Sequence, residues 1–168
     1  MESSLSFSRL LSASKFRFTN FVCSSVDPSW LVVHQCRLKA IRRDWVALNF
    51  NVTLLQTIRK AKVHGQIFKR ASGYKPWLYN FTLDGCRFLK NPYMPVAAII
   101  FNRFKQHSNL NHTCPYSGSV FIMGVQVFAE DIPVPLPSGD YLILIKWYFS
   151  SNLNFSTDLG ISSGIYFS

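Results

Sequence analysis

Apolar and polar side chains alternate along Val46-Ala-Leu-Asn-Phe-Asn-Val-Thr-Leu-Leu-Gln56. Successive side chains of a β-strand point to opposite faces, so a period of two predicts a strand with one buried face. The same stretch contains an N-glycosylation acceptor, Asn51-Val-Thr53, and a glycan must point to water. If Asn51 faces outward, the positions that face inward are all apolar: Leu48, Phe50, Val52 and Leu54.

Similar alternation recurs along the chain and predicts eight strands. We expect them at Lys15–Cys23, Leu31–Ile41, Val46–Gln56, Val63–Arg70, Trp77–Leu83, Ser119–Phe128, Tyr141–Phe149 and Leu153–Tyr166. One stretch, Asn91–Gln106, instead repeats its key side chains every three or four residues, which predicts a short helix. The pattern therefore predicts a mainly β fold, a two-sheet antiparallel β-cup or sandwich with one short helix.

The length of 168 residues is typical of one domain. Residues 1–14 are rich in serine and lack the apolar core of a signal peptide, so we interpret them as a disordered or mis-annotated N-terminus. Residues 15–168 are then a single β domain. The chain contains no run of about 18 apolar residues, so we expect no membrane-spanning helix.

Three further strands can be assigned faces in the same way as the first. Outward Asn80, Lys146 and Gln126 turn a set of large apolar side chains inward. With Phe50, this predicts an inner wall of Phe50, Trp77, Tyr79, Phe81, Phe121, Met123, Ile143, Ile145 and Trp147. Such side chains either fill a core or line an apolar cavity, and the sequence does not separate the two.

Four cysteines, Cys23, Cys36, Cys86 and Cys114, form no C-x-x-C pair and predict two disulfides in an oxidising compartment. Three pairings are possible. Loop length favours Cys23–Cys36 with Cys86–Cys114, although strict alternation places Cys36 inward and Cys23 on the polar side of its strand, unless a bulge intervenes. Secretion is also indicated by four N-glycosylation acceptors, at Asn51, Asn80, Asn111 and Asn154.

The net charge of +10 fits a cationic surface, and also an acidic partner or a membrane surface. We expect no nucleic-acid partner, because no zinc-finger spacing, no RNP-like string and no basic helix with heptads is present. We expect no metal and no cofactor, because the spacing of His107, His112 and Cys114 fits no zinc pattern. Isolated acidic residues and the absence of nucleophile or phosphate-loop motifs predict that the protein is not an enzyme.

Several strings taken together resemble one protein family. They are Phe18-Thr-Asn-Phe-Val-Cys23, Cys36-Arg-Leu-Lys-Ala-Ile-Arg42, Lys69-Arg-Ala-Ser-Gly-Tyr-Lys-Pro-Trp-Leu-Tyr-Asn80, Asp84-Gly-Cys-Arg-Phe-Leu-Lys90, Asn111-His-Thr-Cys-Pro-Tyr116 and Gly139-Asp-Tyr-Leu142. The family is a group of small secreted fly proteins of unknown function that includes the CheB-type chemosensory proteins. It is distantly similar to the ganglioside-activator and ML lipid-recognition proteins.

This resemblance implies an ML-like β-cup and a secreted carrier of a lipid or hydrocarbon, such as a pheromone that is presented to a chemosensory receptor. The inner wall would then bind the ligand, and Ile100 and Phe104 on the predicted helix would form a lid. The alternative is an extracellular interaction protein without a cavity, which acts on a receptor through a basic surface.

Overall fold

The computed structural model describes residues 15–168 except 25, 44, 134 and 152–155. The expected separate N-terminus, residues 1–14, therefore lies outside the described residues. In chain order the elements are β1 (Phe16–Ser24), β2 (Leu31–Arg42), β3 (Trp45–Ile58), β4 (Lys60–Ala71), β5 (Gly73–Asp84), α2 (Gly85–Lys90), α3 (Pro95–Lys105), β6 (Tyr116–Val125), the 3₁₀ turn η1 (Ala129–Asp131), β7 (Gly139–Ser150) and β8 (Ser156–Phe167).

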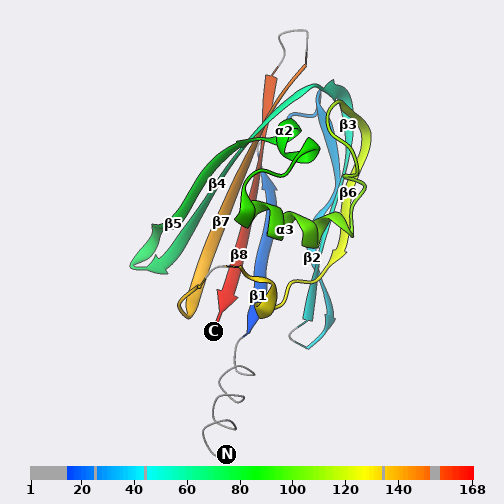
Figure 1. Ribbon diagram of the computed structural model, residues 1–168. Coiled ribbons are helices and arrows are strands. Elements are labelled where there is room, and N and C mark those ends of the chain that lie inside the picture. The colour runs from blue at the N-terminus through cyan, green and yellow to red at the C-terminus, as the bar shows by residue number, and fades with distance from the viewer. Residues whose placement is uncertain (1–14, 25, 44, 134, 152–155) are drawn as a thin grey trace, which may run out of the picture.

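The predicted fold class is confirmed. A five-stranded sheet, in the order β1-β8-β7-β4-β5, faces a three-stranded sheet, in the order β2-β3-β6, and all pairings are antiparallel (Figure 1). The predicted helix is α3, which begins at Pro95, where the missing backbone N–H does no harm. The short helix α2 was not predicted. Its start is capped by Asp84, whose side chain accepts a hydrogen bond from the Arg87 backbone N–H at 3.1 Å.

The two sheets meet along one edge, where β1 of the larger sheet packs beside β2 and β3 of the smaller one. The disulfide Cys23–Cys36 joins β1 to β2 across this edge. A bulge at Thr19 reverses the alternation of β1, since Phe18 pairs with Ile165 and Asn20 pairs with Gly164. The bulge brings Cys23 to the apolar side, which removes the objection that strict alternation raised to this pairing.

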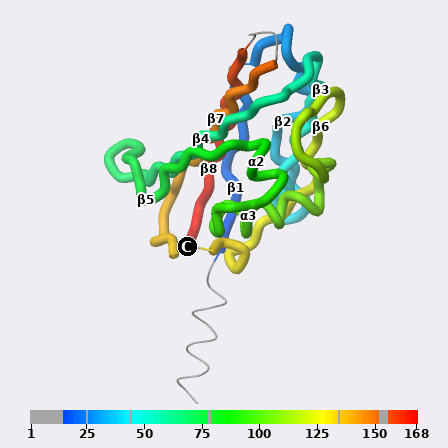
Figure 2. The backbone as a smooth tube through the Cα atoms, turned by 45° about the horizontal axis from the view of Figure 1, so that its top comes forward, coloured from blue at the N-terminus to red at the C-terminus, as the bar shows by residue number. Residues whose placement is uncertain are grey.

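At the opposite edge the sheets diverge, and helices α2 and α3 lie between them (Figures 1 and 2). The second disulfide, Cys86–Cys114, ties α2 to the loop that precedes β6. Both predicted pairings are thus confirmed. Each disulfide connects the side of the larger sheet to the side of the smaller one, one at each edge of the sandwich.

The apolar core fills the space between the sheets. On β3 the face prediction is confirmed, because Leu48, Phe50, Val52 and Leu54 are all buried. A second, smaller cluster of Val63, Leu83 and Phe88 lies under α3 and receives Ala97, Ala98 and Phe101 from that helix.

The face prediction for β6 is wrong for Phe121 and Met123. Phe121 pairs with Asn51, and Ile122 pairs with the buried Phe50, so Ile122 rather than Phe121 shares the core face. The reason is a bulge at Met123–Gly124, which inserts one extra residue between the pairs Phe50↔Ile122 and Leu48↔Val125. Counting back from Gln126 in strict alternation therefore put Phe121 and Met123 on the wrong face, and neither packs against the two core clusters.

Candidate ligand-binding cleft

A cleft of about 720 Å³ lies at the end of the sandwich where β1 begins and β8 ends. The larger sheet contributes Lys15, Phe16, Arg17, Phe18, Tyr166 and Ser168. The other wall is formed by Arg43, Trp45 and Val46 at the start of β3 and by Gln126, Val127, Phe128, Ala129 and Glu130 after β6. The cleft is therefore built where strand ends from both sheets come together.

Aromatic rings line both walls. Phe16 and Phe18 pack edge to face with ring centroids 5.1 Å apart, and Trp45 and Phe128 do the same at 5.8 Å. These four rings present apolar surface that accepts chains of varied shape. The two walls can therefore hold an apolar body between them.

The inner end of the cleft is continuous with the main core. Phe18 belongs to the buried cluster, and Phe16 and Val127 pack against it. An apolar group that enters between the walls would therefore meet buried side chains rather than water. Burial of each CH₂ group would contribute about 0.8 kcal/mol.

Positive charge surrounds the aromatic walls. Lys15, Arg17 and Arg43 line the cleft with one carboxylate side chain, Glu130. The guanidinium of Arg17 lies 5.7 Å from the centre of the Tyr166 ring, and Arg42 lies 3.8 Å from the centre of the Trp45 ring. The cleft therefore combines an apolar interior with an excess of cations, which suits a ligand with an apolar body and an anionic end.

Arg103 connects α3 to one wall of the cleft. Its Nε donates to the Gln126 carbonyl oxygen at 2.9 Å and lies 3.4 Å from a carboxylate oxygen of Asp131. Its guanidinium also lies 5.7 Å from the centre of the Phe128 ring. The helix and the cleft wall are thus held together by one half-buried side chain.

None of the nine side chains predicted for ligand binding lines this cleft. Six of them lie in or against the core clusters between the sheets: Phe50, Trp77, Phe81, Ile143, Ile145 and Trp147. Tyr79 is half-buried and belongs to neither cluster, and Phe121 and Met123 are displaced by the bulge in β6. Side chains at strand ends line the cleft instead.

The two predicted lid residues are four residues apart on α3, so they lie on the same flank of the helix, but they differ in exposure. Phe104 is half-buried and packs against the main core. Ile100 is exposed. Ala97, Ala98 and Phe101 face the sheets and pack against the smaller core cluster. Because the two alanine side chains are small, the helix can approach the strands closely.

Two predicted glycosylation acceptors, Asn80 and Asn111, are exposed, and Asn51 is half-buried. Asn154 lies outside the described residues. Within the part of the chain that the structure describes, no three His, Cys, Asp or Glu side chains come together as a metal site. The described helices include none with the length and apolar character needed to span a membrane.

Residues 63–143 match the family described as "Protein of unknown function (DUF1091)". The match runs from β4 into β7 and includes α2, α3 and the disulfide Cys86–Cys114. Of the residues that line the cleft, it includes only 126–130. Among curated proteins, none matches the chain.

Proposed function

We propose that the protein is a secreted carrier that binds a ligand with an apolar body, a lipid or a long hydrocarbon derivative, in the cleft between its two sheets. The observation that carries the proposal is the cleft, whose volume of about 720 Å³ is within the range of roughly 300–1,000 Å³ typical of small-molecule sites. Its aromatic walls and its continuity with the core supply the apolar surface. The role is binding and presentation, without turnover.

The charges around the cleft favour one end group over others. Among the described residues that line the cleft, the cationic side chains of Lys15 and Arg43 would stabilise an anionic end, such as the carboxylate of a fatty acid. A plain hydrocarbon would gain nothing from them. We therefore rank a long-chain acid above a hydrocarbon as the ligand.

Secretion is supported by the two disulfides, which persist in oxidising compartments, and by the exposed acceptors Asn80 and Asn111. The resemblance to chemosensory proteins suggests that the bound ligand is a pheromone or related signal that is handed to a receptor. The support for a pheromone is the sequence resemblance and not the shape or charge of the cleft.

A second function is favoured by a different surface. Arg37, Lys39, Arg42 and Arg43 are exposed along β2 and the β2–β3 turn, and the whole chain carries a charge of +10. This basic strip suits a receptor with an acidic face. In that case the protein would act through its surface, with or without a ligand in the cleft.

The first test is native mass spectrometry of the full chain, secreted from insect cells. We expect a bound mass that extracts into organic solvent and is a long-chain lipid. A bare protein mass, combined with failure to take up a fluorescent fatty acid, would overturn the carrier function and favour the basic strip.

A cleft-filling substitution locates the site. Val46 lines the cleft, whereas Val32 is an exposed valine on β2. We expect Val46→Trp to weaken fatty-acid binding at least about tenfold, because the indole occupies the space of the chain, and Val32→Trp to leave binding unchanged. Ala129→Trp, in a short turn of the cleft wall, repeats the test if the first variant folds poorly. Equal binding by both cleft variants and the control would exclude this cleft as the site.

A further inference from the structure

Helix α3 is apolar on two sides. Its inner side, Ala97, Ala98 and Phe101, packs against the cluster of Val63, Leu83 and Phe88. Its outer side carries three aliphatic side chains that remain open to solvent: Val96 (40% exposed), Ile99 (52%) and Ile100 (42%). Their spacing of three and four residues places them in one row, which we call the α3 ridge. Amphipathic helices at a protein surface usually carry polar side chains there.

The chain segment that carries the ridge has no negative side chain. From Gly85 to Ala129 the chain contains no Asp or Glu, whereas it contains Arg87, Lys90, Arg103 and Lys105. Arg103 is engaged with Asp131 at the cleft wall. Lys90 and Lys105 are exposed, the first before the helix and the second at its last residue.

Tyr93 lies between α2 and α3 and is partly exposed. Its ring packs edge to face against Phe88 of α2 at 6.1 Å, its hydroxyl accepts a hydrogen bond from the Asp84 backbone N–H at 2.9 Å, and Arg87 lies 4.5 Å from its ring centre. Tyrosine is enriched where proteins meet the boundary between lipid and water. The segment that leads into the ridge therefore carries a side chain suited to that boundary.

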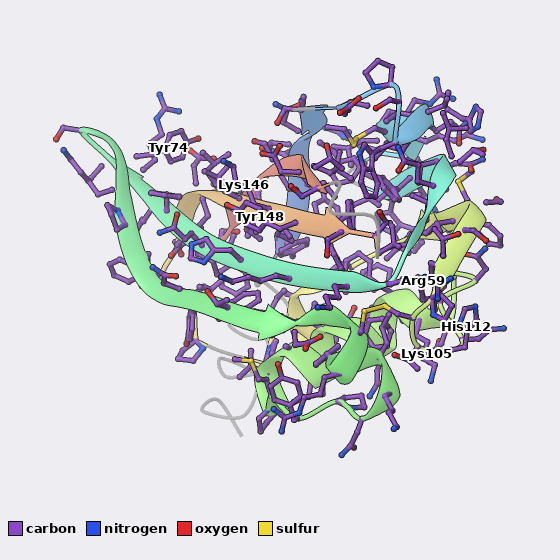
Figure 3. The ribbon with its side chains drawn as sticks, turned by 90° about the horizontal axis from the view of Figure 1, so that it is seen from above. Arg59, Tyr74, Lys105, His112, Lys146 and Tyr148 are labelled. Carbon is purple, nitrogen blue, oxygen red and sulfur yellow. A yellow bond between two sulfur atoms is a disulfide. The ribbon has the colours of Figure 1, made fainter. Side chains whose placement is uncertain are left out.

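The position of α3 leaves its outer side accessible. The helix lies across the diverging edge of the two sheets, and no other described element lies over it in the two views (Figures 1 and 2). Lys105, at its end, lies near His112 and far from Tyr74, which marks the distant tip of the β4–β5 hairpin (Figure 3). The hairpin therefore does not shield the ridge.

A second copy of the chain is a poor occupant for this surface. Each copy carries a charge of +10, and two ridges brought together would also bring together two sets of basic side chains. Like charges at an interface oppose association. An anionic surface is complementary to both features, because it receives apolar side chains and attracts the surrounding cations.

We propose that α3 docks the protein on the surface of an anionic lipid bilayer. Val96, Ile99 and Ile100 enter the boundary between headgroups and acyl chains, while Arg87, Lys90 and Lys105 lie against the headgroups. The inference does not depend on a ligand in the cleft. If the cleft also binds lipid, Arg103 places the docking helix in direct contact with the cleft wall.

The test is co-sedimentation of the full chain with vesicles of phosphatidylcholine alone or mixed with phosphatidylserine. We expect binding to the mixed vesicles that weakens with rising salt, and weak binding to phosphatidylcholine alone. The double variant Ile99→Ser, Ile100→Ser should bind at least about tenfold more weakly. The matched control is Val32→Ser, Leu55→Ser, which removes two exposed aliphatic side chains from the smaller sheet and should bind like the parent protein.

A tryptophan probe reports insertion directly. The parent protein has four tryptophans, so the signal of the probe is the difference between the emission of the variant and that of the parent. This difference should shift to shorter wavelength with mixed vesicles for Ile99→Trp and should not for Leu55→Trp. Equal losses in the ridge variant and the control would overturn the proposal, as would salt-independent binding to both vesicle types. A concentration-dependent dimer in light scattering that the ridge variant abolishes would also overturn it, because the ridge would then be a contact between copies. Thermal unfolding of each variant confirms that it is folded.

Discussion

Individual side chains determine what the cleft can hold. The rings of Trp45 and Tyr166 are each paired with a guanidinium, from Arg42 and Arg17. Such contacts contribute about 0.5–1 kcal/mol at exposed sites and hold the rings in place. The walls are therefore partly ordered before a ligand arrives, which reduces the entropy lost on binding.

Arg43 tests the choice of an anionic end group. We expect Arg43→Gln to weaken binding of palmitate about threefold to fivefold, since an exposed ion pair contributes up to about 1 kcal/mol. Binding of hexadecanol, which has the same chain and no charge, should not change. The affinities can be measured by displacement of a fluorescent fatty acid, with Arg37→Gln on β2 as the control. Equal losses for palmitate and hexadecanol would assign Arg43 a packing role instead.

Tyr141 is a second residue with a measurable consequence, in this case for stability. Its side chain is fully buried, its hydroxyl donates to the Pro137 carbonyl oxygen at 2.6 Å, and burial raises its pKa above the usual value of 10.0. In the unfolded chain the phenol ionises near pH 10, whereas in the folded protein it stays protonated to higher pH. Its contribution to stability is therefore complete below pH 10 and is lost as the pH rises above it.

We expect the melting temperature to fall more steeply above pH 10 in the parent protein than in Tyr141→Phe. The free-energy difference between the two should change by up to about 1.4 kcal/mol per pH unit in that range. Below pH 9 the variant should be less stable by about 1 kcal/mol, because the hydrogen bond is lost. Parallel melting curves across this pH range would show that Tyr141 ionises alike in both states.

At the scale of elements, the sequence predicts where the strands lie, but it does not predict which face each side chain takes once a strand contains a bulge. All eight strands and α3 were predicted, because alternation and the three-and-four repeat are local signals. The faces of β3 followed from one outward asparagine. The faces of β1 and β6 did not follow, because the bulges at Thr19 and Gly124 reverse the alternation part-way along each strand.

The candidate site was harder to predict than the fold. Its residues come from the ends of β1, β3 and β8 and from the segment after β6, and their proximity depends on how far apart the two sheets lie. Alternation in Lys15-Phe-Arg-Phe18 predicted a strand but gave no distance to the opposite wall. Six of the nine side chains of the predicted mid-strand wall instead lie in or against the core clusters.

Gly124 makes the bulge in β6 possible. Its φ of 73° lies in the region that favours glycine, and its backbone N–H donates to Oδ1 of the buried Asn49 at 2.8 Å. A Cβ atom placed there would meet nothing within 4 Å, so only the backbone opposes a side chain. We expect Gly124→Ala to lower the free energy of unfolding by about 1–2 kcal/mol in urea titration. Gly124→Asn should recover part of the loss, since asparagine tolerates this conformation; a greater loss with Asn would contradict the backbone explanation.

For the whole molecule, the two disulfides set how the sheets can move. Cys23–Cys36 fixes the edge where the sheets meet, and Cys86–Cys114 fixes the edge where they diverge. With both edges tied, separation of the sheets is easiest at their ends, and one of those ends contains the cleft. This arrangement allows a ligand to enter while the core stays closed.

Removing either bridge should destabilise the protein by about 2–5 kcal/mol. Their sequence separations are 13 and 28 residues, so the longer loop should cost about 0.7 kcal/mol more from chain entropy alone. To test which loss is larger, both cysteines of one pair are replaced with alanine, and the free energy of unfolding is measured in guanidinium chloride. A greater loss at Cys23–Cys36 would show that its packing against the core outweighs loop length.

The two ends of the described chain lie together, because Lys15 and Ser168 exchange two backbone hydrogen bonds, of 2.8 and 3.0 Å. If the molecule were pulled by these ends, the force would act across β1 and β8 and would break the hydrogen bonds between them one after another, beginning at the termini. Such peeling needs little force. It would stop at Cys23, where the covalent bridge to Cys36 would transfer the load to the smaller sheet. The protein would therefore yield a short, defined length at low tension and then resist.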